Sequence, residues 1–216
     1  MTHIRLLDAD FLINNIRTLS LMDDVIAEEI LEKITSDQHF QWVSTNEVKT
    51  EVNQKLLLKK TTKETDLFFD HKKDIIKKNQ RYLFRKIRFV PITKCPQAPL
   101  LSSTSLRNTG ELSLVILLFC KHHNFSVNQD NSIAIVSNNH KDIAIPFRKA
   151  LKIMNCQSRH FNESNLFQEN YQYYIELFKH LKIEKNLQLY YLFLSNIDAR
   201  FVDTKMIDVF QKIINS

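Results

Sequence analysis

The stretch IRLLDADFLI (residues 4–13) predicts a short buried strand that is followed at once by two carboxylates. Residues 4–7 form a mostly apolar run of strand length, as in the interior of a sheet. Asp8 comes directly after this run, so it is expected at the carboxyl edge of the sheet, where α/β proteins bind ligands. The alternative for Asp8 is a turn or helix-capping aspartate, and Asp10 is interpreted as a support for the turn.

Strand-like and helix-like segments alternate on the C-terminal side of this stretch. Two further apolar runs, residues 40–44 and 133–137, predict buried strands, and residues 89–92 predict a weaker fourth strand. Apolar residues recur at helical spacing in seven segments: 23–35, 45–59, 64–85, 110–123, 166–181, 187–194 and 204–214. The alternation predicts an α/β fold with a mainly parallel central sheet flanked by helices, and a purely helical segment from residue 165 to the end.

The composition predicts one substantial core. The chain has 216 residues, of which 44% are hydrophobic and 25% are charged, as in ordinary globular proteins. We expect an α/β domain in residues 1–160 and a helical extension in residues 161–216 that packs on it or on a partner. The longest apolar run, residues 112–120, is too short to cross a bilayer, and carboxylates interrupt the apolar N-terminal stretch that a secretory signal needs. A cytoplasmic protein with no membrane association is therefore expected.

The charge is distributed unevenly along the chain. Residues 1–48 have a net charge of −6 and residues 49–90 a net charge of +8, within a total of +6. An acidic part beside a basic part is typical of metal-dependent nucleases, because carboxylates hold a cation while Lys and Arg neutralise backbone phosphates. The residues predicted to contact RNA phosphates are Lys72, Lys73, Lys77, Lys78 and Arg81. The alternative is a solvated helix face.

A second candidate acid lies after the second predicted strand. Ser44 and Glu47 have the spacing of a capping box, which would start a helix and explain Glu47 structurally. Glu51 lies one turn further on the same helix face, and no capping pattern accounts for it. Glu51 is therefore favoured as a metal ligand, with Glu47 as its rival.

A third candidate acid is Glu111, which follows Gly110, the only glycine of the chain. A lone acid at a helix start can simply complement the helix dipole. A glycine in so glycine-poor a sequence, however, indicates a close approach of the backbone at that place. Together, Asp8, Glu51 and Glu111 supply the oxygen ligands that Mg²⁺ or Mn²⁺ prefers. Such a cation can activate a water and neutralise the charge that develops during phosphodiester cleavage.

These pieces resemble the PIN-domain family of metal-dependent ribonucleases, which includes many bacterial toxins. The matching segments, in the order of the family, are LLDADFLI, VSTNEVKTEV, GELSLVILL and IAIVSNNHKDIAIPFRKALKI, within residues 1–160. The resemblance implies that Asp8, Glu51 and Glu111 are the metal ligands, and that Ser137 is the hydroxyl residue after the fourth strand. It also implies a nuclease acting on single-stranded or structured RNA, and it is compatible with an inhibitory protein partner and with a homo-oligomer.

One position departs from the pattern of that family. Asn139 stands where an aspartate is common, and Asp142 lies three residues later, where some members carry a compensating acid. The loss of a carboxylate leaves open a non-catalytic PIN-like module that binds RNA or a partner. The pair Asp8 and Asp10 also resembles the start of haloacid-dehalogenase-like phosphatases. That family expects Thr or Val where Leu12 stands and a later acid pair where this chain has asparagines.

Overall fold

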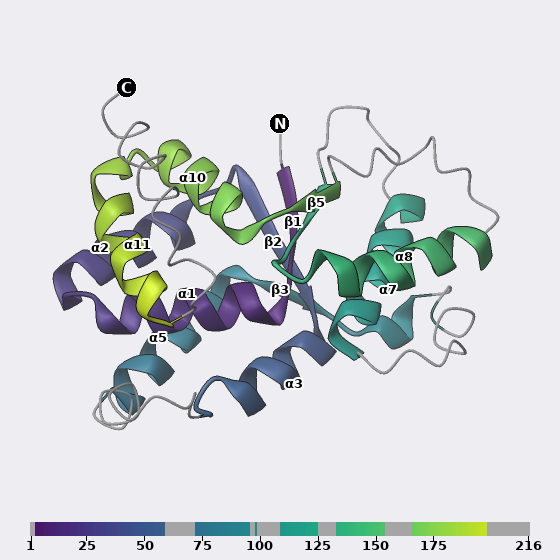
Figure 1. The fold of residues 1–216 in the computed structure, drawn as a ribbon, viewed down its shortest axis with the longest axis horizontal. Coiled ribbons are helices and arrows are strands. Elements are labelled where there is room, and N and C mark those ends of the chain that lie inside the picture. The colour runs from purple at the N-terminus through teal and green to yellow at the C-terminus, as the bar shows by residue number, and fades with distance from the viewer. Residues whose placement is uncertain are drawn as a thin grey trace. The chain divides into compact units, whose positions relative to one another are not determined.

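The computed structural model describes residues 3–58, 72–95, 98, 109–124, 133–153 and 166–197 (Figure 1). The chain divides into two compact units. The first unit comprises residues 1–11, 38–53 and 87–170, and the second comprises residues 12–37, 54–86 and 171–216. The domain boundary expected at residue 160 lies outside the described residues and stays a prediction.

The first unit contains a five-stranded sheet in which every neighbouring pair of strands is parallel (Figure 1). Its strands are β1 (His3–Leu7), β2 (Phe40–Thr45), β3 (Arg88–Val90), β4 (Ile133–Val136) and β5 (Phe167–Gln168), in the order β3-β2-β1-β4-β5. The expected α/β fold with a parallel sheet is thus confirmed, and the sheet contains the four expected strands and a fifth strand, β5. The expectation that the chain is purely helical from residue 165 is wrong at β5. A two-residue strand is too short to produce a periodic pattern.

The register of the strands brings their carboxyl ends to one edge. Leu6 of β1 pairs with Val43 of β2 and with Ile135 of β4, and all three side chains are fully buried. The next pair, Leu7 with Val136, is the last on β1 and β4. The residues that follow these two strands, Asp8 and Ser137, therefore emerge side by side at the edge of the sheet. This is the placement that parallel strands of equal register dictate.

Two helices cover part of this sheet. Helix α7 (Thr109–Asn124) packs against β1, β2 and η1 (Ile92–Lys94), and it also packs against α8 (His140–Ile153). Residues 113–120 of α7 are all buried, which explains why this helix is apolar on every side. Within the described part of the chain, no helix is long and apolar enough to cross a membrane.

The second unit is built from helices. They include α2 (Asp24–Ser36), α5 (Lys73–Lys86) and α11 (Leu187–Ile197), most of α1 (Ala9–Leu21) and α10 (Asn170–His180), and the end of α3 (Asn46–Lys55). Helix α2 packs against α5, and η3 (Glu184–Asn186) precedes α11. The aromatic residues Tyr173, Tyr174 and Tyr190 are fully buried, so they are core side chains rather than base-stacking ones.

Most of the expected helices are confirmed with shifted ends. Helices α2, α3, α5, α7, α10 and α11 correspond to expected segments, whereas residues 204–214 and the first part of segment 64–85 lie outside the described residues. Helix α1 was not expected. Its side chains are buried almost throughout, so its sequence has little polar face to produce helical periodicity.

Candidate functional site

Asp8 is fixed at the carboxyl end of the central strand by hydrogen bonds on both carboxylate oxygens. Ser137 Oγ donates to Asp8 Oδ2 at 2.6 Å, and the backbone N–H of Ala9 donates to Asp8 Oδ1 at 2.7 Å. The backbone N–H of Asp8 donates to the carbonyl oxygen of Val136 at 3.2 Å, which continues the pairing of β1 with β4. The side chain of Asp8 is only 2% exposed. It is thus a buried, oriented carboxylate, and Ser137 lies where the sequence predicted it.

The surroundings of Asp8 make its ionised form unfavourable. Burial raises the pKa of Asp8 well above its ordinary value, and the neighbouring charges of Asp10 and Glu111 raise that pKa further. The hydrogen bonds from Ser137 and Ala9 act in the opposite direction. The structure therefore brings two of the three predicted ligands, Asp8 and Glu111, within electrostatic reach of each other, and it adds Asp10 to them.

Asp10 does more than support a turn. Its Oδ1 accepts a hydrogen bond from the backbone N–H of Phe11 at 2.6 Å. Its Oδ2 accepts one from the backbone N–H of Asn138 at 3.1 Å and one from Asn170 Nδ2 at 3.4 Å. Asp10 thereby connects the residues that follow β1, β4 and β5 at one edge of the sheet.

Asn170 is a site residue that the sequence analysis missed. It is fully buried at the start of α10, and its backbone N–H donates to Asn138 Oδ1 at 3.1 Å. Its own Oδ1 is buried and has no hydrogen-bond partner among the described residues. An asparagine just before the amphipathic run YQYYIELF has the position of a helix cap, and this feature could have drawn attention to it.

Glu51 lies against the first turn of α7. A Cβ atom built on Gly110 would lie 2.5 Å from Glu51 Oε2 and 3.8 Å from Val48 Cγ2. A real Cβ does not approach another atom as closely as 2.5 Å. The absence of a side chain at Gly110 therefore leaves room for the Glu51 carboxylate. The close approach expected at this glycine is confirmed. Glu51 thus reaches the turn that carries Glu111.

The expected capping box at the start of α3 is wrong. Ser44 lies inside β2, and its Oγ donates to the carbonyl oxygen of Leu7 at 2.7 Å. Thr45 is the capping residue instead, because its Oγ1 accepts a hydrogen bond from the backbone N–H of Val48 at 3.2 Å. Glu47 therefore loses its structural explanation. Its Oε2 is buried without a hydrogen-bond partner among the described residues, so Glu47 stays a rival of Glu51.

Asn139 directly precedes α8, and Asp142 lies in the first turn of this helix. The backbone N–H of Asn139 donates to Ser137 Oγ at 2.9 Å, so Asn139 adjoins the group that holds Asp8. The carbonyl oxygen of Asn139 accepts the N–H groups of Asp142 and Ile143 at 3.0 and 3.2 Å. Asp142 is exposed in the first turn of α8, where a carboxylate complements the helix dipole. Its predicted role as a compensating acid stays a prediction.

The residues of this site fit a hydrated cation better than an enclosed one. Among the described residues, no group of three or more His, Cys, Asp or Glu side chains is arranged to hold a metal ion. Magnesium usually needs only one or two carboxylates, since water and substrate phosphate complete its coordination. The buried Asp8 among like charges and the unpartnered Oδ1 of Asn170 are consistent with such an ion and its water shell.

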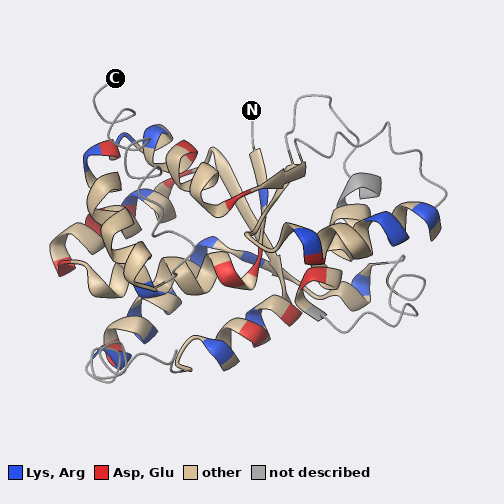
Figure 2. Ribbon diagram, viewed as in Figure 1, with Lys and Arg blue, Asp and Glu red and all other residues tan. Residues whose placement is uncertain are grey.

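The predicted phosphate contacts are on the helix α5 of the second unit or immediately before it (Figure 2). Lys78 Nζ forms an ion pair with Glu28 Oε1 of α2 at 2.6 Å, so this lysine already has a counter-charge. Lys77 and Arg81 are exposed and form no ion pair within the described part of the chain. The remaining predicted residues, Lys72 and Lys73, lie where the helix begins.

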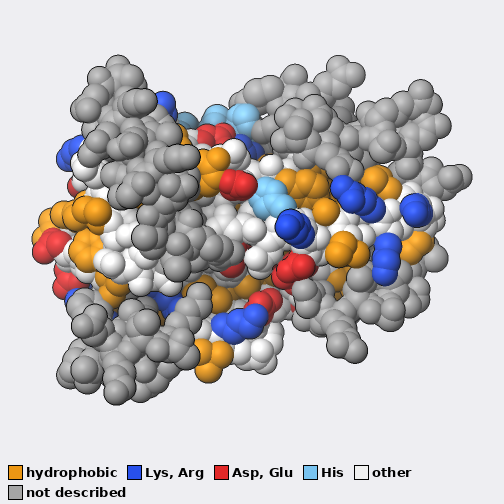
Figure 3. Space-filling model, in the orientation of Figure 1, with side chains coloured by type: hydrophobic (Ala, Val, Ile, Leu, Met, Phe, Trp, Pro, Cys, Tyr) orange, Lys and Arg blue, Asp and Glu red, His pale blue; other side chains and the backbone are white. Residues whose placement is uncertain are grey.

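A second basic surface, which was not expected, lies on α8 in the same unit as Asp8 (Figures 2 and 3). Four basic residues of this helix are exposed: Lys141, Arg148, Lys149 and Lys152. Because α8 begins directly after Asn139, its first turn brings positive charge near the end of β4. The first unit thus carries both an acidic cluster and exposed cations.

No protein-family model, curated protein or solved structure matches this chain.

Proposed function

We propose that this chain is a PIN-like ribonuclease that uses Mg²⁺ or Mn²⁺ to cut RNA by attack of a water molecule. The observation that carries the proposal is the buried Asp8 carboxylate, held by Ser137 beside the charges of Asp10 and Glu111. A carboxylate buried among like charges is unfavourable unless a cation compensates them. In metal-free protein the ionised carboxylates lower the stability of the folded state, and with a cation the same carboxylates form a binding site.

Each residue of the site has a distinct role in this proposal. Asp8 and Glu111 bind the cation, with Glu51 as the third acid and Glu47 as its rival. The cation, when bound, lowers the pKa of a coordinated water and stabilises charge on the scissile phosphate. Ser137 keeps Asp8 Oδ2 in a fixed orientation through its hydrogen bond of 2.6 Å.

Other residues position this group. Asp10, Asn138 and Asn170 connect three strand ends through hydrogen bonds of 3.1 to 3.4 Å, which holds the edge of the sheet in one conformation. Asn139 contributes an amide in place of the usual carboxylate, and Asp142 would supply part of the missing charge by turning towards the site.

The substrate in this proposal is cytoplasmic RNA. Lys77 and Arg81 on α5 and the exposed cations of α8 would neutralise its phosphates. An inhibitory protein partner, as in toxin and antitoxin pairs, and self-association are further predictions of the PIN-like assignment.

The decisive experiment measures cleavage and metal binding together. A fluorescently labelled single-stranded RNA should be cut in Mg²⁺ or Mn²⁺ and remain intact in EDTA. Asp8→Asn should abolish both the cleavage and the binding of Mn²⁺ seen by electron paramagnetic resonance, while circular dichroism stays unchanged. Glu32→Gln, an exposed change on α2, is the matched control and should behave as wild type. Full cleavage by Asp8→Asn, or by wild type in EDTA, would refute the proposal.

A non-catalytic RNA-binding module is the second candidate. Asn139 removes a charge from the site, and no group of three metal-binding acids or similar ligands is found among the described residues. This candidate predicts that wild type binds RNA in both metal and EDTA and never cuts it. The same assay therefore separates the two functions.

A further inference from the structure

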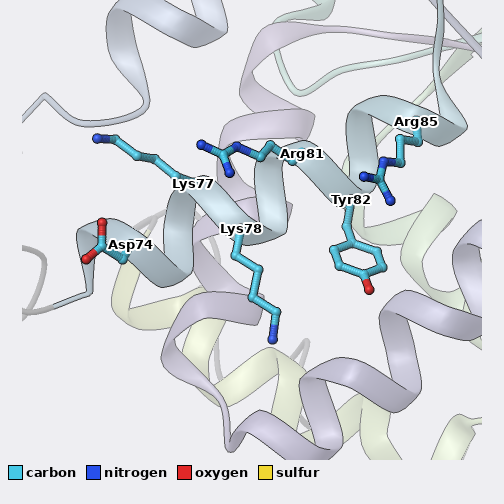
Figure 4. Close-up of a pocket in the computed structure, with 6 residues that line it drawn as sticks. All are labelled: Asp74, Lys77, Lys78, Arg81, Tyr82 and Arg85. Atoms are coloured by element: carbon cyan, nitrogen blue, oxygen red, sulfur yellow. The ribbon is translucent and has the colours of Figure 1, made fainter.

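Helix α5 presents two neighbouring rows of side chains to solvent (Figure 4). Residues four positions apart lie on the same side of a helix. The first row consists of Lys77, Arg81 and Arg85, and the second of Asp74, Lys78 and Tyr82. Together these six residues line a hollow of about 320 Å³. The volume is at the lower end of the range for pockets that bind small molecules or parts of larger ligands.

Tyr82 is the unusual member of this surface. The buried residues of α5 are Ile76, Asn79 and Leu83, and Tyr82 is not among them. The side chain is 39% exposed, and the guanidinium carbon of Arg85 lies 5.6 Å from the centre of its ring. Such a cation–π contact helps to hold the ring in place. An aromatic ring that is exposed, supported and flanked by cations has the features of a stacking platform.

The charges around Tyr82 are not equivalent. Lys78 is paired with Glu28 at 2.6 Å, and the Glu28 carboxylate raises the pKa of Lys78. Lys77 and Arg81, in contrast, form no ion pair within the described part of the chain. Successive members of their row are about 6 Å apart along the helix axis. The surface therefore has available cations in one row beside an aromatic ring in the other.

From this arrangement we propose that α5 binds single-stranded RNA, with one nucleobase stacked on Tyr82 and neighbouring phosphates bound by Lys77 and Arg81. The inference rests on the proposed function only in taking RNA as the ligand. A single strand fits because its bases are free to stack, whereas a duplex hides their faces. The aromatic ring beside cations favours a nucleic acid, which supplies both bases and phosphates, over an acidic protein, which supplies negative charge alone.

The test measures RNA binding in the absence of cleavage. Fluorescence anisotropy of a labelled single-stranded RNA in EDTA measures the affinity of wild type without cleavage. Tyr82→Leu should weaken binding by roughly 5- to 150-fold, which corresponds to the loss of one stacked base, and Tyr82→Phe should retain the affinity. Lys77→Gln with Arg81→Gln should reduce the slope of log affinity against log salt by about 1.4, whereas Tyr82→Leu should leave the slope unchanged.

Two controls make the outcome decisive. Lys94→Gln changes an exposed lysine outside α5 and should leave affinity unchanged. An oligonucleotide of abasic sites keeps the phosphates but cannot stack, so it should bind wild type as weakly as normal RNA binds Tyr82→Leu. The difference between normal and abasic strands on wild type does not depend on the folding of any variant.

Three results would overturn the inference. They are equal affinity of wild type and Tyr82→Leu, equal affinity of wild type for normal and abasic strands, and competition by polyglutamate as strong as competition by RNA. The last result would indicate an acidic protein as the partner. Absence of cleavage with intact, Tyr82-dependent binding would instead refute the proposed ribonuclease activity and leave this inference standing.

Discussion

Replacing Gly110 by alanine is a direct test of whether Glu51 belongs to the metal site. The new Cβ would lie 2.5 Å from Glu51 Oε2, and ordinary contact begins at 3.4 Å, so the oxygen must retreat by about 0.9 Å. Apart from the adjoining residues and backbone of α7, the next neighbours of that Cβ among the described residues are the carboxyl carbon of Glu51 itself at 3.7 Å and Val48 Cγ2 at 3.8 Å. The substitution therefore displaces one carboxylate and little else.

The expected effect on stability is small. Alanine is favoured over glycine within a helix by up to about 1 kcal/mol. A shifted Glu51 rotamer costs about 0.5–1.5 kcal/mol. The two effects oppose each other, so the free energy of unfolding should change by less than about 1 kcal/mol and the melting temperature by less than about 4 °C.

The expected effect on metal binding is large. Metal sites tolerate deviations of only about 0.2 Å in ligand distance, well below the retreat of Glu51. Even residues that merely orient ligands contribute 10- to 100-fold to metal affinity. Gly110→Ala should therefore raise the Mg²⁺ or Mn²⁺ concentration for half-maximal cleavage by roughly 10-fold or more, which a metal titration of RNA cleavage measures.

The control for this prediction is a double-mutant cycle. If Gly110→Ala acts through Glu51, adding it to Glu51→Gln should change nothing further. A metal requirement equal to that of wild type in Gly110→Ala would refute the role of Glu51 and favour Glu47 as the ligand. A melting temperature lowered by more than about 10 °C would show that the backbone, rather than the carboxylate, has moved.

Three other predictions concern charge and stability. In metal-free protein, stability should fall as the pH rises from 3.8, the ordinary pKa of Asp8, through its raised pKa, because the folded state disfavours the ionised form. Asp8→Asn should abolish this part of the fall, which urea titrations between about pH 4 and pH 8 measure. Asn139→Asp should lower the Mg²⁺ concentration for half-maximal cleavage, and Asp142→Ala should raise it. An unchanged concentration for Asp142→Ala would show that Asp142 only complements the dipole of helix α8. Arg17→Ala should lower the free energy of unfolding by roughly 2–4 kcal/mol, because the buried guanidinium donates to carbonyl oxygens at the end of α3, and urea unfolding at pH 7 checks it.

Much of the fold could be predicted from the sequence because its central strands are short, apolar and followed by polar residues. Residues 4–7 and 133–137 have this form, and they correspond to β1 and β4. Their parallel pairing also explains why Asp8 and Ser137 could be expected at one edge. The order of strands and helices along the sequence was sufficient to predict the positions of Asp8 and Ser137.

The fifth strand and its contribution could not be predicted in the same way. β5 has only two residues, and it becomes a strand through its pairing with Ile135 and Val136 of β4. That pairing is a tertiary contact, so no local sequence pattern predicts it. Asn170 follows β5, so its position at the edge of the sheet could not be predicted either.

Side-chain ion pairs and hydrogen bonds between residues far apart in the sequence could not be predicted either. The charge of Lys78 suggested a phosphate contact, but Glu28, fifty positions earlier in the chain, is close enough to pair with it. The capping box failed for a related reason. Ser44 has the right spacing to Glu47, yet its hydroxyl is taken by the carbonyl oxygen of Leu7 on the neighbouring strand. Local motifs thus compete with tertiary partners that the sequence does not display.

The charge at Asp8 is difficult to explain by stability alone. An asparagine at this position could still accept one of the two hydrogen bonds, from Ser137 or from the N–H of Ala9, and it would remove the penalty of burying a charge and the repulsion from Asp10 and Glu111. Each unit by which the pKa of Asp8 is raised corresponds to about 1.36 kcal/mol of lost stability when the group is ionised. A binding module that holds no cation would be more stable without the negative charge of Asp8. A carboxylate that must ionise in order to bind metal instead links metal affinity to pH, so binding should release a proton and strengthen as the pH rises through the pKa of Asp8.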